Sequence, residues 1–301
     1  MTEILVRAGC FVAIIVLGAV LRRAGFFKRE DFSLLSKIVI RITLPAAIIT
    51  NFAGRELDHS LLILILIGFL CGAAHMLTAW LLNRRRDSAA QAFAVLNTSG
   101  VNIGNFVLPF AQGFLGPAGV MVVSLFDVGN AVTCLGGSYS MAGMLLDKGK
   151  RFSLKPVLLS LVKSFPLITY ILACTLCLLH INLPGPIVSL AGIIGNANAF
   201  LAMLMLGVGF RLDGSRIPEV LRLLLPRYLV GMALAALCYF LLPVQPIYRT
   251  ALIIPFLGPV ATAAPAFTAL LKGDYELASA VNSCSILISI VLITAALIFF
   301  V

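Results

Sequence analysis

Asn97-Thr-Ser-Gly-Val-Asn-Ile-Gly-Asn-Phe-Val-Leu-Pro109 and Gly258-Pro-Val-Ala-Thr-Ala-Ala-Pro265 interrupt two otherwise apolar stretches of the chain. Each lies in a hydrophobic run long enough to cross a bilayer, which takes about 20 helical residues. Proline removes a backbone donor and glycine loosens a helix, so both stretches predict broken membrane helices. Such breaks persist only inside protein or beside a polar cavity, because the freed backbone groups need partners. A matching pair of breaks points to the substrate site of a secondary transporter.

The composition places nearly the whole chain in a membrane. Of the 301 residues 61% are hydrophobic and 11% are charged, and the mean hydropathy is +1.08. Soluble domains carry about 25% charged residues. Apolar runs of about 20 residues favour helices over the short alternating strands of a barrel. The seven cysteines fall inside these runs and are expected to be small core residues without disulfides.

The positive charges set the expected topology. The net charge is +10, but the basic residues gather in alternate short connections, as the positive-inside rule requires of cytoplasmic loops. The charge is therefore no sign of a nucleic-acid partner. All Lys and Arg except Arg7, Arg55 and Arg249 are expected on or near the cytoplasmic side. Both chain ends are then expected outside the cytoplasm, in a multi-pass protein of the cell membrane.

The apolar runs predict ten spans, and the charged segment 147–163 separates five of them from the other five. An odd number in each half inverts the second half relative to the first. We therefore expect an all-α polytopic membrane protein with ten transmembrane helices as two inverted five-helix repeats, residues 1–146 and 164–301. The cytoplasmic linker 147–163 is expected to contain a short interfacial helix. The spans are expected at about 4–22, 33–53, 60–82, 89–112, 117–142, 164–182, 185–210, 226–243, 247–271 and 275–300.

The repeat is visible in the spacing of a few residues. Pro109 and Pro265 take equivalent places in spans four and nine, and Asp127 and Ser283 each follow them by 18 residues. This spacing supports the repeat without deciding it.

Asn102 and Asn105 are the leading candidates for substrate binding. Gly100 and Gly104 beside them indicate an unwound segment, and Gly258 marks the second break. An amide offers two donors and an acceptor, and half-helix N-termini add partial positive charge, so the pair could hold a carboxylate without a formal cation. The alternative is that these amides only satisfy the freed backbone; the two roles are compatible.

Asp127 is the acidic side chain expected deepest in a span, in span five. A charge near the bilayer centre is costly, so the carboxyl should pair, protonate or face water. We expect Asp127, together with Asn130 one turn on, to carry a coupling proton or to organise the cation or substrate site. The alternative is a structural carboxyl bonded to broken backbone.

Other polar residues in the spans are weaker candidates. His75 could relay protons, although a lone histidine on an apolar helix is more often a packing residue. Arg41 could reach the substrate path or snorkel toward the cytoplasm. Asn51 and Asn198 could line the cavity or bond between helices.

Several motifs taken together resemble the auxin efflux carrier family, which includes bacterial carriers related to plant PIN-FORMED proteins within the bile acid/arsenite/riboflavin transporter superfamily. The resemblance covers essentially the whole chain, in order. The motifs are Leu44-Pro-Ala-Ala-Ile-Ile, Val101-Asn-Ile-Gly-Asn-Phe-Val-Leu-Pro-Phe, Phe126-Asp-Val-Gly-Asn-Ala, Leu206-Gly-Val-Gly-Phe, and Pro265 through Gly273-Asp-Tyr-Glu-Leu-Ala-Ser.

This resemblance implies a scaffold of spans one, two, six and seven and a moving transport domain of spans three to five and eight to ten. It also implies that spans four and nine cross at their breaks and bind a small organic anion there. Gly104, Pro259 and Val260 then join the two amides as expected binding residues, and Gly100, Pro109, Gly258 and Pro265 shape the crossing. A homodimer through the scaffold is likewise implied.

The function expected from these observations is secondary transport of a small organic carboxylate by elevator-type alternating access. No GxxxxGK[ST] loop is present, and no HExxH motif or second deep carboxylate supports an intramembrane enzyme. A channel or a non-transporting sensor built on the same broken helices is the alternative. No cofactor is expected, and coupling to H⁺, to Na⁺ or to neither stays open.

Overall fold

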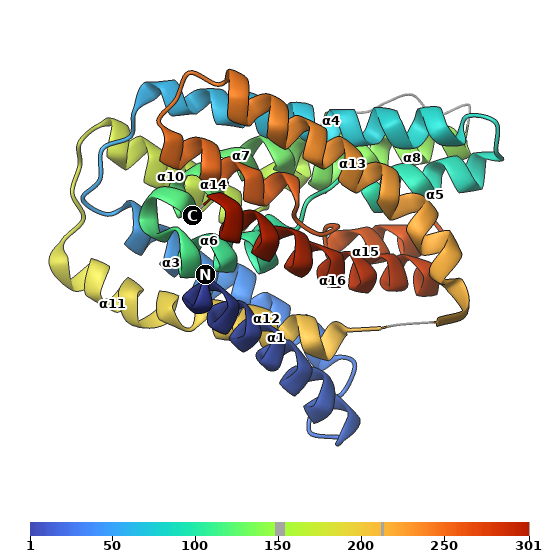
Figure 1. Ribbon diagram of the computed structural model, residues 1–301, viewed down its shortest axis with the longest axis horizontal. Coiled ribbons are helices and arrows are strands. Elements are labelled where there is room, and N and C mark those ends of the chain that lie inside the picture. The colour runs from blue at the N-terminus through green and yellow to red at the C-terminus, as the bar shows by residue number, and fades with distance from the viewer. Residues whose placement is uncertain (148–153, 212–213, 301) are drawn as a thin grey trace.

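The computed structural model describes residues 1–147, 154–211 and 214–300, and nearly all of its regular structure in these ranges is helical (Figure 1). Within the described residues, extended backbone pairs only in the bridge between Val101 and Val260. The helices are α1 (Thr2–Arg23), α2 (Asp31–Ile38), α3 (Leu44–Phe52), α4 (Ile63–Asn83), α5 (Ser88–Thr98), α6 (Leu108–Phe114), α7 (Gly116–Val132), α8 (Ser138–Leu146), α9 (Leu154–Val162), α10 (Phe165–Leu178), α11 (Gly185–Asn196), α12 (Asn198–Gly209), α13 (Ile217–Leu241), α14 (Pro246–Phe256), α15 (Ala263–Leu270) and α16 (Tyr275–Phe300).

Short segments of different pitch connect several of these helices. The π-helical turns η1 (Val39–Thr43), η3 (Ile103–Val107) and η4 (Thr133–Gly137) continue directly into α3, α6 and α8. The 3₁₀ turns η2 (His59–Leu62) and η5 (Gly214–Arg216) precede α4 and α13. Single π-helical turns inside α-helices occur frequently at functional sites.

Seven helical segments in the described residues are long and apolar enough to cross a membrane. Many of their large side chains point outward, such as Phe240 at 76% exposure, as expected of surfaces that face lipid. These segments are Thr2–Arg23, Asp31–Phe52, His59–Asn83, Gly116–Leu146, Gly185–Gly209, Gly214–Leu241 and Tyr275–Phe300. The protein is therefore a multi-pass helical membrane protein.

The three other predicted spans take different forms. Span six is the 14-residue apolar helix α10. Spans four and nine are each divided into two shorter helices, α5 and α6 in one case and α14 and α15 in the other. The helix expected in the linker is α9, while residues 148–153 of that linker lie outside the described residues.

Predicted span seven agrees with the segment Gly185–Gly209, within which α11 and α12 meet at Ala197. The predicted start of span eight is wrong. Span eight begins at Ile217 rather than at 226, because α13 accommodates Pro226 in its interior. Arg227 therefore lies about two fifths of the way along a membrane helix, buried to 2% exposure, and not at the cytoplasmic surface.

The helices pack as two groups. Helices α1, α2, α3, α11 and α12 pack mainly against one another, with α10 against α3. The other group contains α4, α5, α7, α8 and α13 to α16, and its most extensive contacts are between α4 and α7. Figure 1 shows α1, α11 and α12 along the lower side of the molecule and α4 and α13 along the upper side. The space between the groups contains the site described next.

The connections between helices collect at two ends of the molecule. Arg86, Glu219 and Asp274 surround one cavity, which brings together the α4–α5, α13 and α15–α16 connections. Gly54 and His180 line a different cavity at the opposite end. Figure 1 shows α16 running from the first end toward the terminus marked C. The α4–α5 connection with Arg86 and the first turns of α13 with Arg222 thus lie together at one end, while the side of the membrane that they face stays a prediction.

Candidate functional site

The two helix breaks meet in the middle of the molecule. Val101 and Val260 form an antiparallel bridge. The Asn102 N–H donates to the Pro259 carbonyl at 2.9 Å, and the Ala261 N–H donates to the Gly100 carbonyl at 3.1 Å. We call residues 99–102 and 257–262 the crossover. The breaks in the sequence thus satisfy part of their freed backbone by pairing with each other.

Glycine lets the two segments come this close. A Cβ atom on Gly258 would lie 2.6 Å from Val107 Cγ2 and 2.7 Å from Val101 Cγ1. A Cβ atom on Gly100 would lie 3.0 Å from both Ala261 Cβ and Cys134 Sγ. Any side chain at Gly258 would therefore push the bridge apart, which explains both glycines as structural residues of the crossover.

Polar side chains on neighbouring helices hold the remaining backbone groups of Val101 and Val260. On α7, Asn130 Oδ1 accepts from the Val101 N–H at 3.1 Å, and Asn130 Nδ2 donates to the Val101 carbonyl at 3.0 Å. On α16, Ser285 Oγ accepts from the Val260 N–H at 3.0 Å, and Asn282 Nδ2 donates to the Val260 carbonyl at 2.8 Å. Both bridge residues are thus fully bonded, as buried backbone requires.

A buried arginine contacts the same backbone from the α13 side. Arg227 donates to the carbonyls of Thr98, Gly258, Gly100 and Pro259. Among the predicted binding residues, Pro259 therefore bonds with Asn102 and Arg227, and Val260 is fully buried in the bridge. Both residues build the crossover, and neither lines the cavity beside it.

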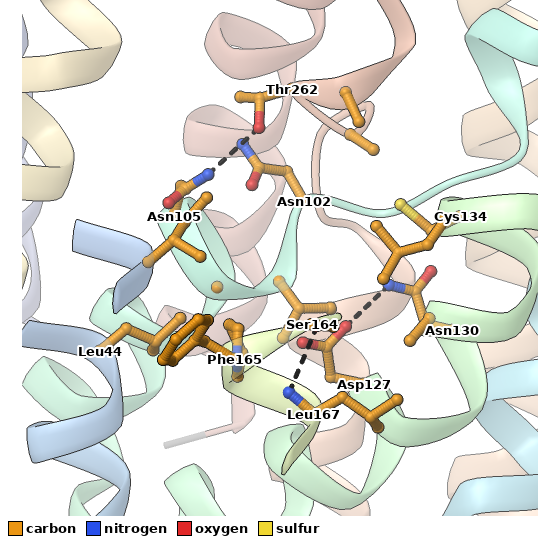
Figure 2. Close-up of a pocket in the computed structure, with 18 of the residues that line it drawn as sticks. Leu44, Asn102, Asn105, Asp127, Asn130, Cys134, Ser164, Phe165, Leu167 and Thr262 are labelled. Carbon is orange, nitrogen blue, oxygen red and sulfur yellow. Dashed lines mark hydrogen bonds between the residues drawn. The ribbon is translucent and has the colours of Figure 1, made fainter. Parts of the chain in front are cut away.

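A cavity of about 410 Å³ lies against the crossover, between the two helix groups (Figure 2). All three π-helical turns border it, through Arg41 of η1, Asn105 of η3 and Cys134 of η4. Gly104 also lines this cavity, and its missing Cβ leaves room for Leu44. Three irregular turns therefore converge on one space at the helix breaks.

The predicted amides Asn102 and Asn105 both line this cavity and are each 4% exposed. Asn105 Nδ2 donates to Thr262 Oγ1 of the second break at 3.1 Å. Asn102 Nδ2 and Asn105 Oδ1 are buried and have no hydrogen-bond partner among the described residues. Leaving such a group unpaired costs about 1–3 kcal/mol, so a ligand that bonded with them would recover this energy.

Asp127 lies on the opposite wall of the cavity, on α7. Its Oδ1 accepts from Asn130 Nδ2 at 2.9 Å, and Figure 2 shows this bond beside Leu167 of α10. Tyr170 of α10 lines the same region. Asn130 connects the Asp127 carboxylate to the Val101 backbone at the crossover, while the coupling role of this pair stays a prediction.

Basic side chains surround the way to this cavity. Lys37, Arg41 and Lys163 line it, and the Arg41 guanidinium lies 5.4 Å from the centre of the Phe165 ring. An adjoining cavity of about 480 Å³ shares some of the same walls and is lined by further cations and polar groups of the loop end. Its basic residues are Arg22, Arg29, Lys37 and Arg211. The positive surroundings favour a negatively charged ligand.

Three other predicted residues lie away from this cavity. Asn51 Nδ2 donates to the Ala47 carbonyl of its own helix at 2.7 Å. Asn198 Oδ1 accepts from Thr43 Oγ1 at 3.0 Å and ties α12 to η1. His75 Nε2 lies 3.1 Å from the Arg227 carbonyl and ties α4 to α13. Each side chain thus bonds within or between helices, outside the cavity at the crossover.

The two prolines stand at the starts of the second half-helices. Pro265 is in the first turn of α15, where a missing N–H costs little, whereas Pro109 lies where the π-helical turn η3 continues into α6. Pro109 follows Val101 by eight positions and Pro265 follows Val260 by five, so the bridge does not make them equivalent. Asn130 and Ser285 accept from the N–H groups of the two bridge residues, and on that alignment Asp127 matches Asn282 rather than Ser283.

Sequence reasoning missed two residues of the site. Thr262 is the polar residue that the second break presents to the cavity. Arg227 bonds to the crossover from the α13 side. Thr262 lies between alanines in a stretch that already stood out for its glycine and prolines, so a polar residue there was the available signal. Among the described residues no cluster of His, Cys, Asp or Glu could hold a metal ion, and all seven cysteines are free.

The fold and the site define a class: a multi-pass helical membrane protein whose interrupted helices enclose a polar cavity at the centre of the bundle. Residues 10–301 match the sequence model of the family described as "Membrane transport protein". The chain therefore belongs to this transporter family, and the resemblance to auxin efflux carriers is confirmed. Membership in a family of transporters fits the expectation that the chain is not an enzyme.

One relative is an uncharacterized transporter from Methanothermobacter thermautotrophicus. It is 25% identical over 140 residues, which make up 45% of this chain and 45% of the relative. The chain thus aligns with less than half of that transporter's length.

Proposed function

We propose that this protein is a secondary transporter that carries a small organic anion, bound at the crossover, by alternating access. The observation that carries the proposal is the pair of buried amide atoms, Asn102 Nδ2 and Asn105 Oδ1, that lack partners beside the cavity. Asn102 Nδ2 can donate to a carboxylate oxygen, and Asn105 Oδ1 can accept from a hydroxyl or a protonated acid group of the same ligand.

The helix ends at the crossover support an anionic ligand. The first turns of η3–α6 and of α15 begin next to the cavity, and a helix N-terminus carries partial positive charge. Lys37, Arg41 and Lys163 add full charges to the approach. Fixed donors at the centre with cations along the entrance are the arrangement expected for attracting and binding a carboxylate.

The internal symmetry supports the ten-span inverted repeat. Val101 is bonded by Asn130 on α7, and Val260 is bonded by Asn282 and Ser285, one turn apart on α16. We assign the group with α1, α3 and α12 to a stationary scaffold and the group with both breaks to a transport domain. The cavity has walls from both groups, so a rigid movement of one past the other would expose it to alternate sides. A scaffold-mediated homodimer remains a prediction.

Asp127 is the residue we assign to coupling. A carboxylate in the binding cavity repels an anionic substrate unless it binds a proton or a cation, so substrate and proton favour each other's binding. The side chain lies inside a long apolar helix with one amide donor, an environment in which an ionised carboxyl is costly. The protein then resides in the cell membrane with its basic connections in the cytoplasm and both described ends outside.

The direct test is counterflow in proteoliposomes. Vesicles loaded with an unlabelled organic acid should accumulate the labelled acid transiently above its equilibrium level, because a carrier exchanges one ligand for another. A conductance that follows the driving force without exchange would instead indicate a pore, and binding without flux would indicate a sensor.

The ligand can be found by melting the purified protein with a panel of monocarboxylates, dicarboxylates and indole acids. A ligand that binds the native state alone raises the melting temperature by mass action. The matched control is Asn102→Ala, which should lose most of the shift. A shift that is equal in this variant would place the ligand elsewhere.

A further inference from the structure

Arg227 contacts the crossover only through main-chain oxygens. Its Nε lies 2.9 Å from the Thr98 carbonyl and its Nη1 lies 2.8 Å from the Gly258 carbonyl. Its Nη2 lies 3.3 Å from the carbonyls of both Gly100 and Pro259. Four oxygens from two breaks, more than 150 residues apart in the chain, thus converge on one guanidinium.

The Thr98 oxygen is the last carbonyl of α5, and the other three oxygens lie just beyond the ends of α5 and α14. Helix α5 ends at Thr98 and α14 ends at Phe256, so both C-termini point at the crossover. The last carbonyls of a helix lack intrahelical partners and carry partial negative charge. Two such ends facing each other inside a membrane protein need a common positive partner, and Arg227 supplies one.

No acidic residue compensates this charge locally. In the described part of the chain no ion pair involves Arg227, and its other neighbour is the Tyr228 ring, 5.3 Å away. A buried cation without a carboxylate is costly. Its position is therefore explained by the carbonyls that it holds, not by pairing with an acid.

Unwound carbonyls and half-helix C-termini are the groups that coordinate Na⁺ or receive H⁺ in many secondary transporters. We propose that Arg227 is the resident cation of this crossover, a positioning residue whose guanidinium occupies the place of a bound metal cation and keeps the two breaks in register. This inference rests on the proposed transport function, because that function makes the crossover a binding site. The thermal test below does not require transport.

The test is chemical rescue of Arg227→Ala in purified protein. This variant should melt lower than wild type by about 5 °C or more, since it loses four buried contacts. Guanidinium at low millimolar concentration, far below denaturing levels, should recover several degrees in Arg227→Ala alone. The matched control is Arg222→Ala, which removes an exposed arginine of the same helix. An equal response of wild type and Arg227→Ala to guanidinium would overturn the proposal.

Two further variants separate the charge from the hydrogen bonds if the alanine variant does not fold. Arg227→Lys keeps the charge, and Arg227→Gln keeps donors without it, so the lysine variant should melt higher and retain more counterflow. The reverse order would contradict a cation role. An absence of counterflow in the wild-type protein would contradict the proposed transport function. The thermal rescue experiment would still test the role of Arg227.

Discussion

The two breaks have the same backbone geometry but different side chains. Asn102 of the first break corresponds to Ala261 of the second, since each follows a bridge residue, and Asp127 on α7 corresponds to Asn282 on α16. The first break has one amide, Asn130, for both backbone groups of Val101, whereas the second divides this task between two residues.

This difference teaches which residues the architecture needs and which the function needs. Each break requires polar partners for a buried extended residue, so these partners recur in both halves. The unpaired amide atoms and the carboxylate occur on the first-break side, where no backbone group requires them. The ligand and coupling roles are therefore expected to belong mainly to the first break, with Thr262 as the contribution of the second.

The largest effect is expected on removing the single-residue support of the first break. Asn130→Ala leaves both the N–H and the carbonyl of Val101 unbonded and should lower the free energy of unfolding by roughly 2–5 kcal/mol. Ser285→Ala leaves only one group of Val260 unbonded and should cost about 1–2 kcal/mol. Thermal unfolding in detergent measures both. A greater loss in Ser285→Ala would show that the supports are not divided as described.

Making the two breaks alike at the acidic position tests coupling. Asp127→Asn gives both halves an amide there and should reduce proton-driven uptake about 100-fold, the size of effect seen when a proton-transferring group is lost. Uptake as a function of pH measures it, with Asn282→Ala as the control that keeps the carboxyl. Undiminished, pH-dependent uptake in Asp127→Asn would rule out the coupling role.

Ligand binding is tested at Asn102 and at its counterpart in the second break, Ala261. Asn102→Ala reproduces the second break and should weaken the affinity for the ligand about 10-fold, the loss expected for one hydrogen bond to a charged group. Ala261→Ser, at the equivalent place, should leave the affinity nearly unchanged. Calorimetric or thermal-shift titration compares them, and equal losses would mean that both breaks bind ligand.

The smallest effect is expected at the start of α16, where Asp274 caps the helix. Burial acts to raise the pKa of Asp274, but the bonds from the Leu277 N–H and from Arg216 outweigh it and hold this pKa below its ordinary value. A lowered folded pKa means that the stabilisation is present above the unfolded pKa, near 4, and is lost as pH falls through the folded pKa.

Asp274→Asn keeps the helix cap and removes the charge, so it should cost about 0.5 kcal/mol at neutral pH. It should also flatten the loss of stability in acid. Melting curves of both proteins from pH 6 to pH 3 measure this, and parallel curves would assign the acid sensitivity to other groups. Helix α7, which follows the first break, begins at Gly116 and has no such acidic cap.

The positions of the breaks and of Asn102, Asn105 and Asp127 could be predicted because each is a local exception in an apolar run. Glycine and proline mark broken helices, and amides or acids at membrane depth are rare. Arg227 could not be placed in the same way, because Pro226 before it was taken as the start of a span. The helix in fact continues through this proline.

Contacts between distant segments were the least accessible part. The π-helical turns have no distinct composition, so their convergence on one cavity emerges only from packing. The match of Asp127 with Asn282 was missed by one residue, because the prolines used for alignment do not hold equivalent places in the two breaks. The hydrogen bonds of Asn130 and Ser285 to the bridge residues fix this alignment.

Burying Arg227 in the proposed transport domain has an electrical consequence. A charge that crosses the membrane field gains or loses about 2.3 kcal/mol per 100 mV. With Asp127 ionised, the empty crossover contains one charge of each sign, and with a monoanion and a proton bound it again sums to zero. The movement of the loaded crossover and the return of the empty crossover would then both be insensitive to membrane voltage.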